Sequence, residues 1–106
     1  MTNWQTRATK FAEDHNLTRS PGVYALDLLS ELGEVAKEIL LATDYGKRPF
    51  DAQSTHPELA GELGDALYSL CLLAQTANID LEKAFTDTLA KYKRRRQHHG
   101  NMGSLG

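Results

Sequence analysis

Apolar residues recur at helical spacing along most of the chain, and no stretch alternates as a half-buried strand would. Local signals mark where the helices begin. Ser20 followed by Pro21 is typical of a helix start, with serine as the cap and proline in the first turn. Pro57 opens the third helix, with Thr55 or His56 as the cap, and Asp80 caps the fourth. We therefore expect helices over residues 2–16, 21–43, 57–77 and 81–96.

This pattern predicts an all-α chain, an antiparallel four-helix arrangement that resembles a bundle and completes its core by oligomerisation. The length of 106 residues fits a single domain, residues 1–106. Its expected core covers residues 2–97. Residues 98–106 hold too few apolar groups to dock, so they are expected to form a flexible tail.

Two of the predicted helices carry a row of acidic residues beside their apolar face. An α-helix turns about 100° per residue, so these acids fall on a narrow arc of each helix, next to the stripe that must be buried. The rows are Asp27, Glu31, Glu34 and Glu38 on the second helix, and Glu58, Glu62 and Asp65 on the third.

A short repeat lies within these rows. The sequence Glu-Leu-Gly-Glu at residues 31–34 is matched by Glu-Leu-Gly-Asp at residues 62–65. Gly33 and Gly64 therefore lie inside helices, where glycine costs about 1 kcal/mol relative to alanine. The missing side chains would let another backbone or a bulky ligand come close.

Antiparallel packing of the second and third helices would bring both acidic rows together at the margin of the core. Carboxylates crowded into a partly dry groove repel one another unless they take up protons or bind cations. Hard divalent ions such as Mg²⁺ prefer oxygen ligands of this kind. The same pattern also fits a solvated acidic face without a ligand, which is the alternative interpretation.

Overall composition is that of an ordinary globular protein, but charge is unevenly distributed. The formal net charge is -2, which argues against a long nucleic acid as partner. Residues 22–65 hold 9 acidic and 3 basic side chains, whereas residues 81–96 hold 6 basic and 2 acidic ones. A lone cysteine, Cys71, and no apolar stretch long enough to cross a bilayer predict a cytoplasmic protein without a membrane partner.

The two acidic motifs resemble those of the MazG-type all-α nucleoside triphosphate pyrophosphohydrolases, whose pattern is ExxE, a variable gap, then ExxD. Here the motifs are Glu31 with Glu34 and, after 27 residues, Glu62 with Asp65. The resemblance extends from Leu28 to about residue 96. Ser30 stands where members often carry a further Glu, which leaves the substrate type open.

The resemblance implies hydrolysis of a (deoxy)nucleoside triphosphate to the monophosphate and pyrophosphate, in a house-cleaning role. It implies that Glu31, Glu34, Glu62 and Asp65 hold Mg²⁺, with Mn²⁺ as a possible substitute. The attacking water needs a proton acceptor, and Glu34 and Glu38 are the candidates for this catalytic role. Glu38 is equally well explained as an exposed residue paired with a lysine.

Phosphate and base recognition call for cations and a stacking surface. The candidate phosphate-binding residues are Lys91, Arg94, Arg95 and Lys47. Basic residues late in a helix also complement its dipole, so that role is an alternative. Trp4 and Phe11 are the candidate base-pocket residues, although aromatic residues at helical spacing commonly belong to the core.

Two other functions remain open at this point. One is a phosphoribosyl-ATP pyrophosphohydrolase, which shares the helical superfamily, and the other is a non-catalytic helical module that binds a partner protein. The long apolar stripes predict a homodimer or homotetramer, and the resemblance implies the same.

Overall fold

The computed structural model describes residues 2–99, which form four α-helices and no strand. The helices are α1 (Asn3–Asp14), α2 (Pro21–Ala42), α3 (Pro57–Thr76) and α4 (Leu81–His99). The all-helical prediction is therefore confirmed for this part of the chain. None of these helices is both long and apolar enough to span a membrane.

The helix boundaries follow the local signals in the sequence. Ser20 caps α2, its side chain accepting a hydrogen bond from the backbone of Val23, and Asp80 accepts one from the backbone of Glu82 at the start of α4. His56 occupies the cap position of α3 but makes no side-chain capping bond. Helix α4 continues three residues beyond the predicted end, so residues 98 and 99 are helical. The rest of the predicted tail, residues 100–106, lies outside the described residues.

The buried core of the chain is small and sits where α1, α2 and α3 meet. Its central cluster consists of Ala12, Tyr24 and Leu72, one from each helix, and α3 adds the buried residues Ala66, Cys71 and Ala74. The hydroxyl of Tyr24 donates a hydrogen bond to the carbonyl of Leu17 at 2.7 Å and accepts one from the backbone of Arg19. These bonds fix the connection between α1 and α2 against the core.

A buried glutamine ties the start of the chain to the turn between α3 and α4. Gln5 is fully buried; its amide nitrogen donates to the carbonyl of Ile79 at 2.7 Å, and its amide oxygen accepts from the backbone of Leu81 at 2.9 Å. Because both polar atoms of the side chain are satisfied, its burial is stable. This contact positions α1 beside the first residues of α4.

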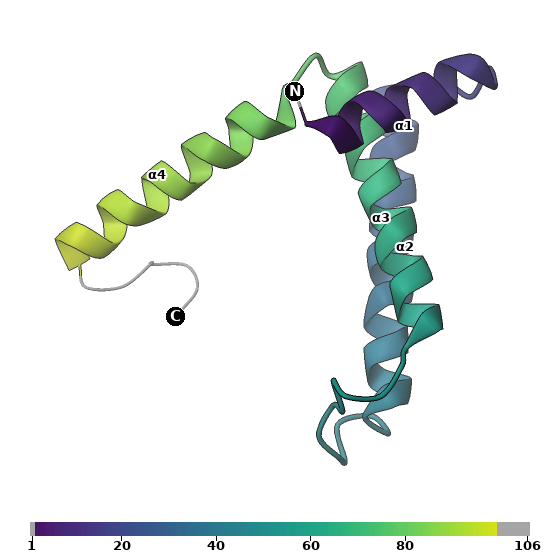
Figure 1. Ribbon diagram of the computed structural model, residues 1–106, viewed down its shortest axis with the longest axis vertical. Helices are drawn as coiled ribbons and strands as arrows, with labels where there is room; N and C mark the ends of the chain where they lie inside the picture. Colours follow the sequence, from purple (N-terminus) through teal and green to yellow (C-terminus); the bar gives the residue numbers. More distant parts are fainter. Residues whose placement is uncertain (1, 100–106) are drawn as a thin grey trace.

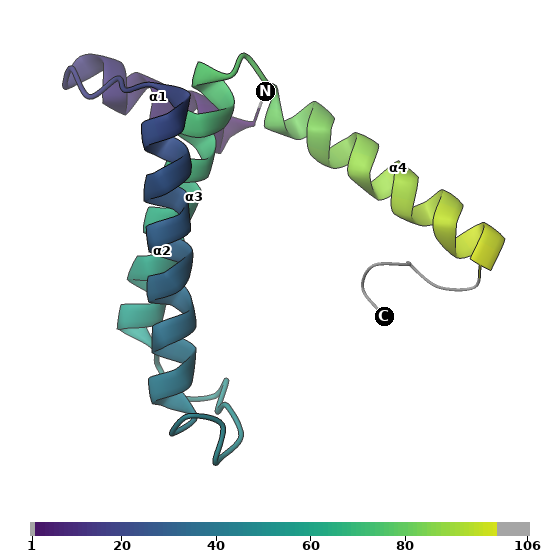
Figure 2. The same ribbon diagram turned by 180° about the vertical axis from the view of Figure 1, so that it is seen from behind.

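Helices α2 and α3 form an antiparallel pair, α1 crosses near one end of it, and α4 extends away from all three (Figures 1 and 2). The predicted antiparallel packing is thus present for α2 and α3, whereas a closed four-helix bundle is not formed within one chain. The chain exposes 7794 Å², against roughly 5,900 Å² for a compact monomer of its mass. Much apolar surface is therefore left uncovered.

Candidate functional site

Three carboxylates from the two acidic rows converge between α2 and α3. Glu31 on α2 and Glu62 and Asp65 on α3 each offer an oxygen, and these oxygens lie within 4.8 Å of one another. Glu31 and Glu62 are half-buried and Asp65 is exposed. Antiparallel packing brings them together because each row borders the face that packs against the other helix. The arrangement matches an oxygen-ligand site for a divalent cation.

Electrostatic repulsion within this acidic cluster, defined as Glu31, Glu62 and Asp65, is strongest at Glu62. The pKa of Glu62 is raised above its ordinary value, first by loss of water around the carboxyl group and then by the negative charges of Glu31 and Asp65. Glu34 contributes a smaller effect of the same sign. Three negative groups therefore act on the Glu62 carboxyl group, and a bound cation would relieve that repulsion.

The structure separates the two candidate proton acceptors. Glu34 acts electrostatically on Glu62 but does not belong to the acidic cluster. Glu38 lines a cavity of about 240 Å³ with His56 and Glu58. Glu34 therefore influences the acidic cluster through its charge, whereas Glu38 faces the connection between α2 and α3.

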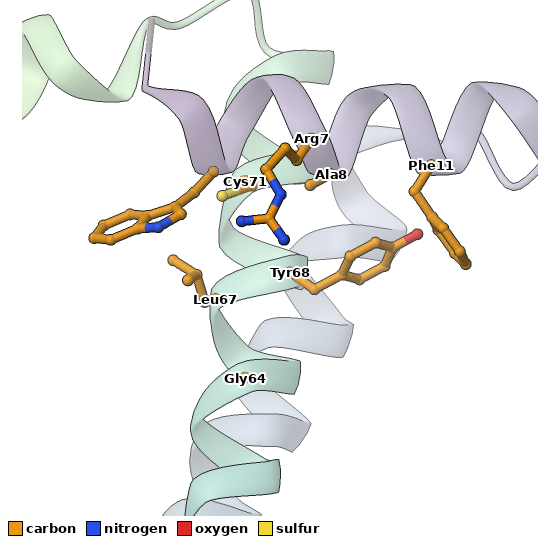
Figure 3. Close-up of a pocket in the computed structure, with 8 residues that line it drawn as sticks. Arg7, Ala8, Phe11, Gly64, Leu67, Tyr68 and Cys71 are labelled. Carbon is orange, nitrogen blue, oxygen red and sulfur yellow. The ribbon is translucent and has the colours of Figure 1, made fainter.

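An aromatic cavity of about 500 Å³ lies between α1 and α3, and both predicted base-pocket residues line it. We call it the α1–α3 cavity; its lining residues are Trp4, Arg7, Ala8, Phe11, Gly64, Leu67, Tyr68 and Cys71. Figure 3 shows Arg7 directed from α1 toward α3, beside the ring of Tyr68. The rings of Phe11 and Tyr68 meet edge to face with centroids 6.1 Å apart.

The α1–α3 cavity adjoins the acidic cluster along α3. Gly64 lines the cavity and lies between Glu62 and Asp65 in the sequence. Tyr68 follows Asp65 by three positions, which corresponds to about 4.5 Å along the helix and roughly 60° around it. A molecule in the cavity would therefore have the acidic cluster as its neighbour.

Two lining residues, Arg7 and Tyr68, escaped the sequence-based prediction. Arg7 lies three residues after Trp4, and Tyr68 lies three residues after Asp65, so each is about one helical turn from a predicted site residue. This spacing alone does not distinguish them from other helix residues. On α1 only the aromatic residues indicate a base pocket, and Tyr68 lies within an apolar run that is typical of a core. Arg7 and Tyr68 line the same cavity because α1 crosses α3.

The predicted phosphate-binding residues are not brought to the acidic cluster within one chain. Lys91, Arg94 and Arg95 lie on α4, which points away from α2 and α3 (Figures 1 and 2). The ammonium group of Lys91 stands 5.4 Å from the ring centroid of Tyr92. Lys47 lies in the exposed connection after α2.

The glycines of the repeat face open space within the chain. A Cβ atom added at Gly33 or Gly64 meets nothing within 4 Å. The close backbone approach that we considered for these positions is therefore not found among the described residues. Gly64 does line the α1–α3 cavity, so space for a ligand is the property that the structure supports there.

Comparisons with known proteins give one consistent result. A family model described as the MazG nucleotide pyrophosphohydrolase domain matches residues 19–100. The chain is also similar to YpjD, an uncharacterized protein of Bacillus subtilis (strain 168), with 34% identity over 76 residues that cover 72% of this chain and 67% of that protein. No solved structure matches the chain. Helix α1 lies outside the segment matched by the family model.

Proposed function

The chain belongs to the MazG nucleotide pyrophosphohydrolase domain family, and from that premise we propose that it hydrolyses a (deoxy)nucleoside triphosphate to the monophosphate and pyrophosphate with Mg²⁺. Clearing unwanted nucleotides from the cellular pool is the role that we assign to this reaction. The observation that carries the proposal is the convergence of Glu31, Glu62 and Asp65 within 4.8 Å.

The donor set fits a hard divalent ion. It consists only of carboxylate oxygens, two of them on half-buried side chains, and Mg²⁺ prefers such ligands together with substrate phosphates and water. We propose Glu34 as the fourth residue of this metal centre, since its charge already acts on Glu62. When bound, the cation supplies charge neutralisation for the phosphates and makes a water molecule more acidic.

In the hydrolysis, a water oxygen bonds to the α-phosphorus, the bond between that phosphorus and the bridging oxygen breaks, and pyrophosphate leaves. The proton of the water needs an acceptor. We propose Glu34 for this role, because it lies beside the acidic cluster and, if it holds the ion through one carboxylate oxygen, its other oxygen stays free to accept the proton. Glu38 is the second candidate, and its place beside His56 favours a role at the outer end of the groove.

A second copy of the chain is needed to cover the apolar surface, and we propose a homodimer or homotetramer. Leu29 and Leu40 of α2 and Leu63 and Leu70 of α3 are all exposed. At about 100° per residue, Leu29 lies roughly 140° around α2 from Glu34, so these leucines occupy the side of the helix pair away from the acids. A second α2–α3 pair packed on this side would form a four-helix core.

Assembly also gives the basic end of α4 a function. Because α4 stands apart from the acidic cluster of its own chain, we propose that Lys91, Arg94 and Arg95 bind the triphosphate held by another copy. Arginine suits this task, since its planar fork binds phosphate oxygens in pairs. Lys47, in the connection between α2 and α3, is proposed to contribute from the same chain.

The proposal is tested by incubating the purified protein with Mg²⁺ and a panel of canonical and modified deoxynucleoside triphosphates, with phosphoribosyl-ATP included. The products are separated by ion-exchange chromatography. We expect nucleoside monophosphate and pyrophosphate in equal amounts from at least one triphosphate. Folded protein that releases no pyrophosphate from any of them would refute the proposal, and turnover of phosphoribosyl-ATP alone would assign the chain to that reaction instead.

A further inference from the structure

Arg7 is an exposed charged residue that lines the aromatic α1–α3 cavity and has no partner among the described residues. Its side chain reaches from α1 toward α3 beside Tyr68 (Figure 3). Among residues 2–99 it forms no hydrogen bond or ion pair, in contrast to Lys10 on the same helix, which pairs with Asp14 at 3.0 Å. An arginine in these surroundings is available to a ligand.

The α1–α3 cavity offers hydrogen-bond donors and lacks a strong acceptor. Among the described residues, no carboxylate or amide side chain lines it. The Arg7 guanidinium carries five donors and no acceptor, and the indole of Trp4 carries one donor. The hydroxyl of Tyr68 is protonated at neutral pH, all the more because burial raises its pKa above the ordinary value of 10, and it donates as well. A ligand that fits must therefore present acceptors at the edge of a flat, largely apolar body.

A nucleobase with carbonyl groups has this form. Guanine presents two adjacent acceptors, O6 and N7, that a guanidinium binds in pairs, whereas adenine places an amino group where O6 would be. The triphosphate itself is a poor occupant, since the lining offers a single cation, Arg7, for several negative charges and is otherwise largely apolar. The neighbouring acidic cluster, together with the divalent ion that we propose there, is the place for the phosphates.

We propose that Arg7 determines base specificity, selecting nucleotides whose base carries a carbonyl oxygen at position 6 of a purine or position 4 of a pyrimidine, guanine first, over adenine and cytosine, which carry an amino group at that position. This inference rests on the proposed pyrophosphohydrolase function and adds the substrate class. It also goes beyond the family match, because α1 lies outside the matched residues 19–100. Helix α1 thus supplies selectivity to a catalytic unit built from α2 and α3.

The first test compares kcat/KM within pairs of bases of equal size. For the wild type we expect kcat/KM for dGTP to exceed that for dATP by roughly 5- to 100-fold. We also expect kcat/KM for dTTP to exceed that for dCTP. Arg7→Gln should reduce the dGTP to dATP ratio at least 5-fold, because glutamine pairs with the N6 and N7 edge of adenine. Lys10→Gln removes the same charge from the outside of α1 and should leave the ratio unchanged.

The second test does not depend on turnover. Trp4 is the single tryptophan of the chain, so its fluorescence reports on the α1–α3 cavity. Without metal, dGMP should change this fluorescence at a concentration at least 5-fold lower than dAMP does, and Arg7→Gln should remove the difference.

Each result has one meaning. Equal kcat/KM values for dGTP and dATP in the wild type would overturn the inference while the proposed function stands. An unchanged dGTP to dATP ratio in Arg7→Gln would do the same. A uniform loss for all four triphosphates would overturn it too, since it would identify Arg7 as a phosphate contact. If no triphosphate is hydrolysed, the proposed function fails, and the fluorescence titration alone decides about Arg7: equal binding of dGMP and dAMP overturns the inference.

Discussion

Glu62 is the residue of the acidic cluster whose pKa is raised by its surroundings. Its carboxyl group has lost part of its water and faces the charges of Glu31 and Asp65. Repulsion of this kind opposes folding unless a proton or a cation compensates it. The sequence predicted this crowding from two acidic rows beside apolar stripes, and the structure identifies Glu62 as the residue most affected.

The raised pKa of Glu62 predicts a pH dependence of stability. The folded protein holds this proton more tightly than the unfolded chain, whose carboxyl group titrates near 4.5. The stabilisation is therefore fully present below pH 4.5 and is lost as pH rises through the folded-state pKa. In thermal unfolding of the metal-free protein, the melting temperature should fall as pH rises from 4.5 through the folded-state pKa of Glu62.

Glu62→Gln is the control for this titration, since it removes the group and should flatten that part of the profile. Adding Mg²⁺ to the wild type should raise the melting temperature more at pH 7 than at pH 5. Superimposable metal-free profiles of wild type and Glu62→Gln would show that the carboxyl group is ordinary and solvated.

At the scale of the helices, the sequence predicted elements well and their mutual placement only in part. Caps such as Ser20 and Asp80 act within a few residues, so local pattern suffices to find them. The bonds of Gln5 to Ile79 and Leu81 join residues more than 70 positions apart, and a polar side chain in an ordinary helix gives no sign of them. The crossing of α1 over α3, and with it the α1–α3 cavity, depends on such contacts.

Gly64 in α3 provides a prediction about this element. Gly64→Ala should raise the free energy of unfolding by up to about 1 kcal/mol, because alanine favours the helix and its Cβ meets nothing within 4 Å. The same methyl group enters the α1–α3 cavity, so KM for the preferred nucleotide should rise roughly 5-fold.

Gly61→Ala is the matched control, since Gly61 lies in the same helix, also faces open space and does not line the cavity. It should stabilise the protein to a similar extent without changing KM. Denaturant titration and steady-state kinetics measure the two effects. Destabilisation by Gly64→Ala would mean that another backbone packs there, as an approaching second chain would.

At the scale of the whole molecule, the dominant feature is apolar surface without a partner. Leu29 is 68% exposed and Leu63 is 52% exposed, yet both lie on the helices that form the acidic cluster. Among the described residues, six apolar ones are buried, which is a small core for a chain of 106. The uneven charge of the sequence fits an assembly in which the basic α4 of one copy meets the acidic groove of another.

Assembly is tested by substitution on the apolar side of the α2–α3 pair. Light scattering of the wild type should give at least twice the chain mass of 11.8 kDa, and Leu29→Glu should reduce it to that of a single chain. Val23→Glu adds the same charge at an exposed apolar position of α2, roughly 120° away around the helix, and should preserve the assembly. A wild type that is monomeric at micromolar concentration would contradict this account.

The central claim, that Glu31, Glu62 and Asp65 form the metal centre, is tested most directly by titrating the protein with Mn²⁺ and following the free ion by electron paramagnetic resonance. The wild type should bind Mn²⁺, and Mg²⁺ should displace it. Glu62→Gln should weaken binding by at least roughly 10-fold, while Glu13→Gln, an exposed substitution on α1, should not change it. Equal binding by all three proteins, or none by the wild type, would contradict the claim.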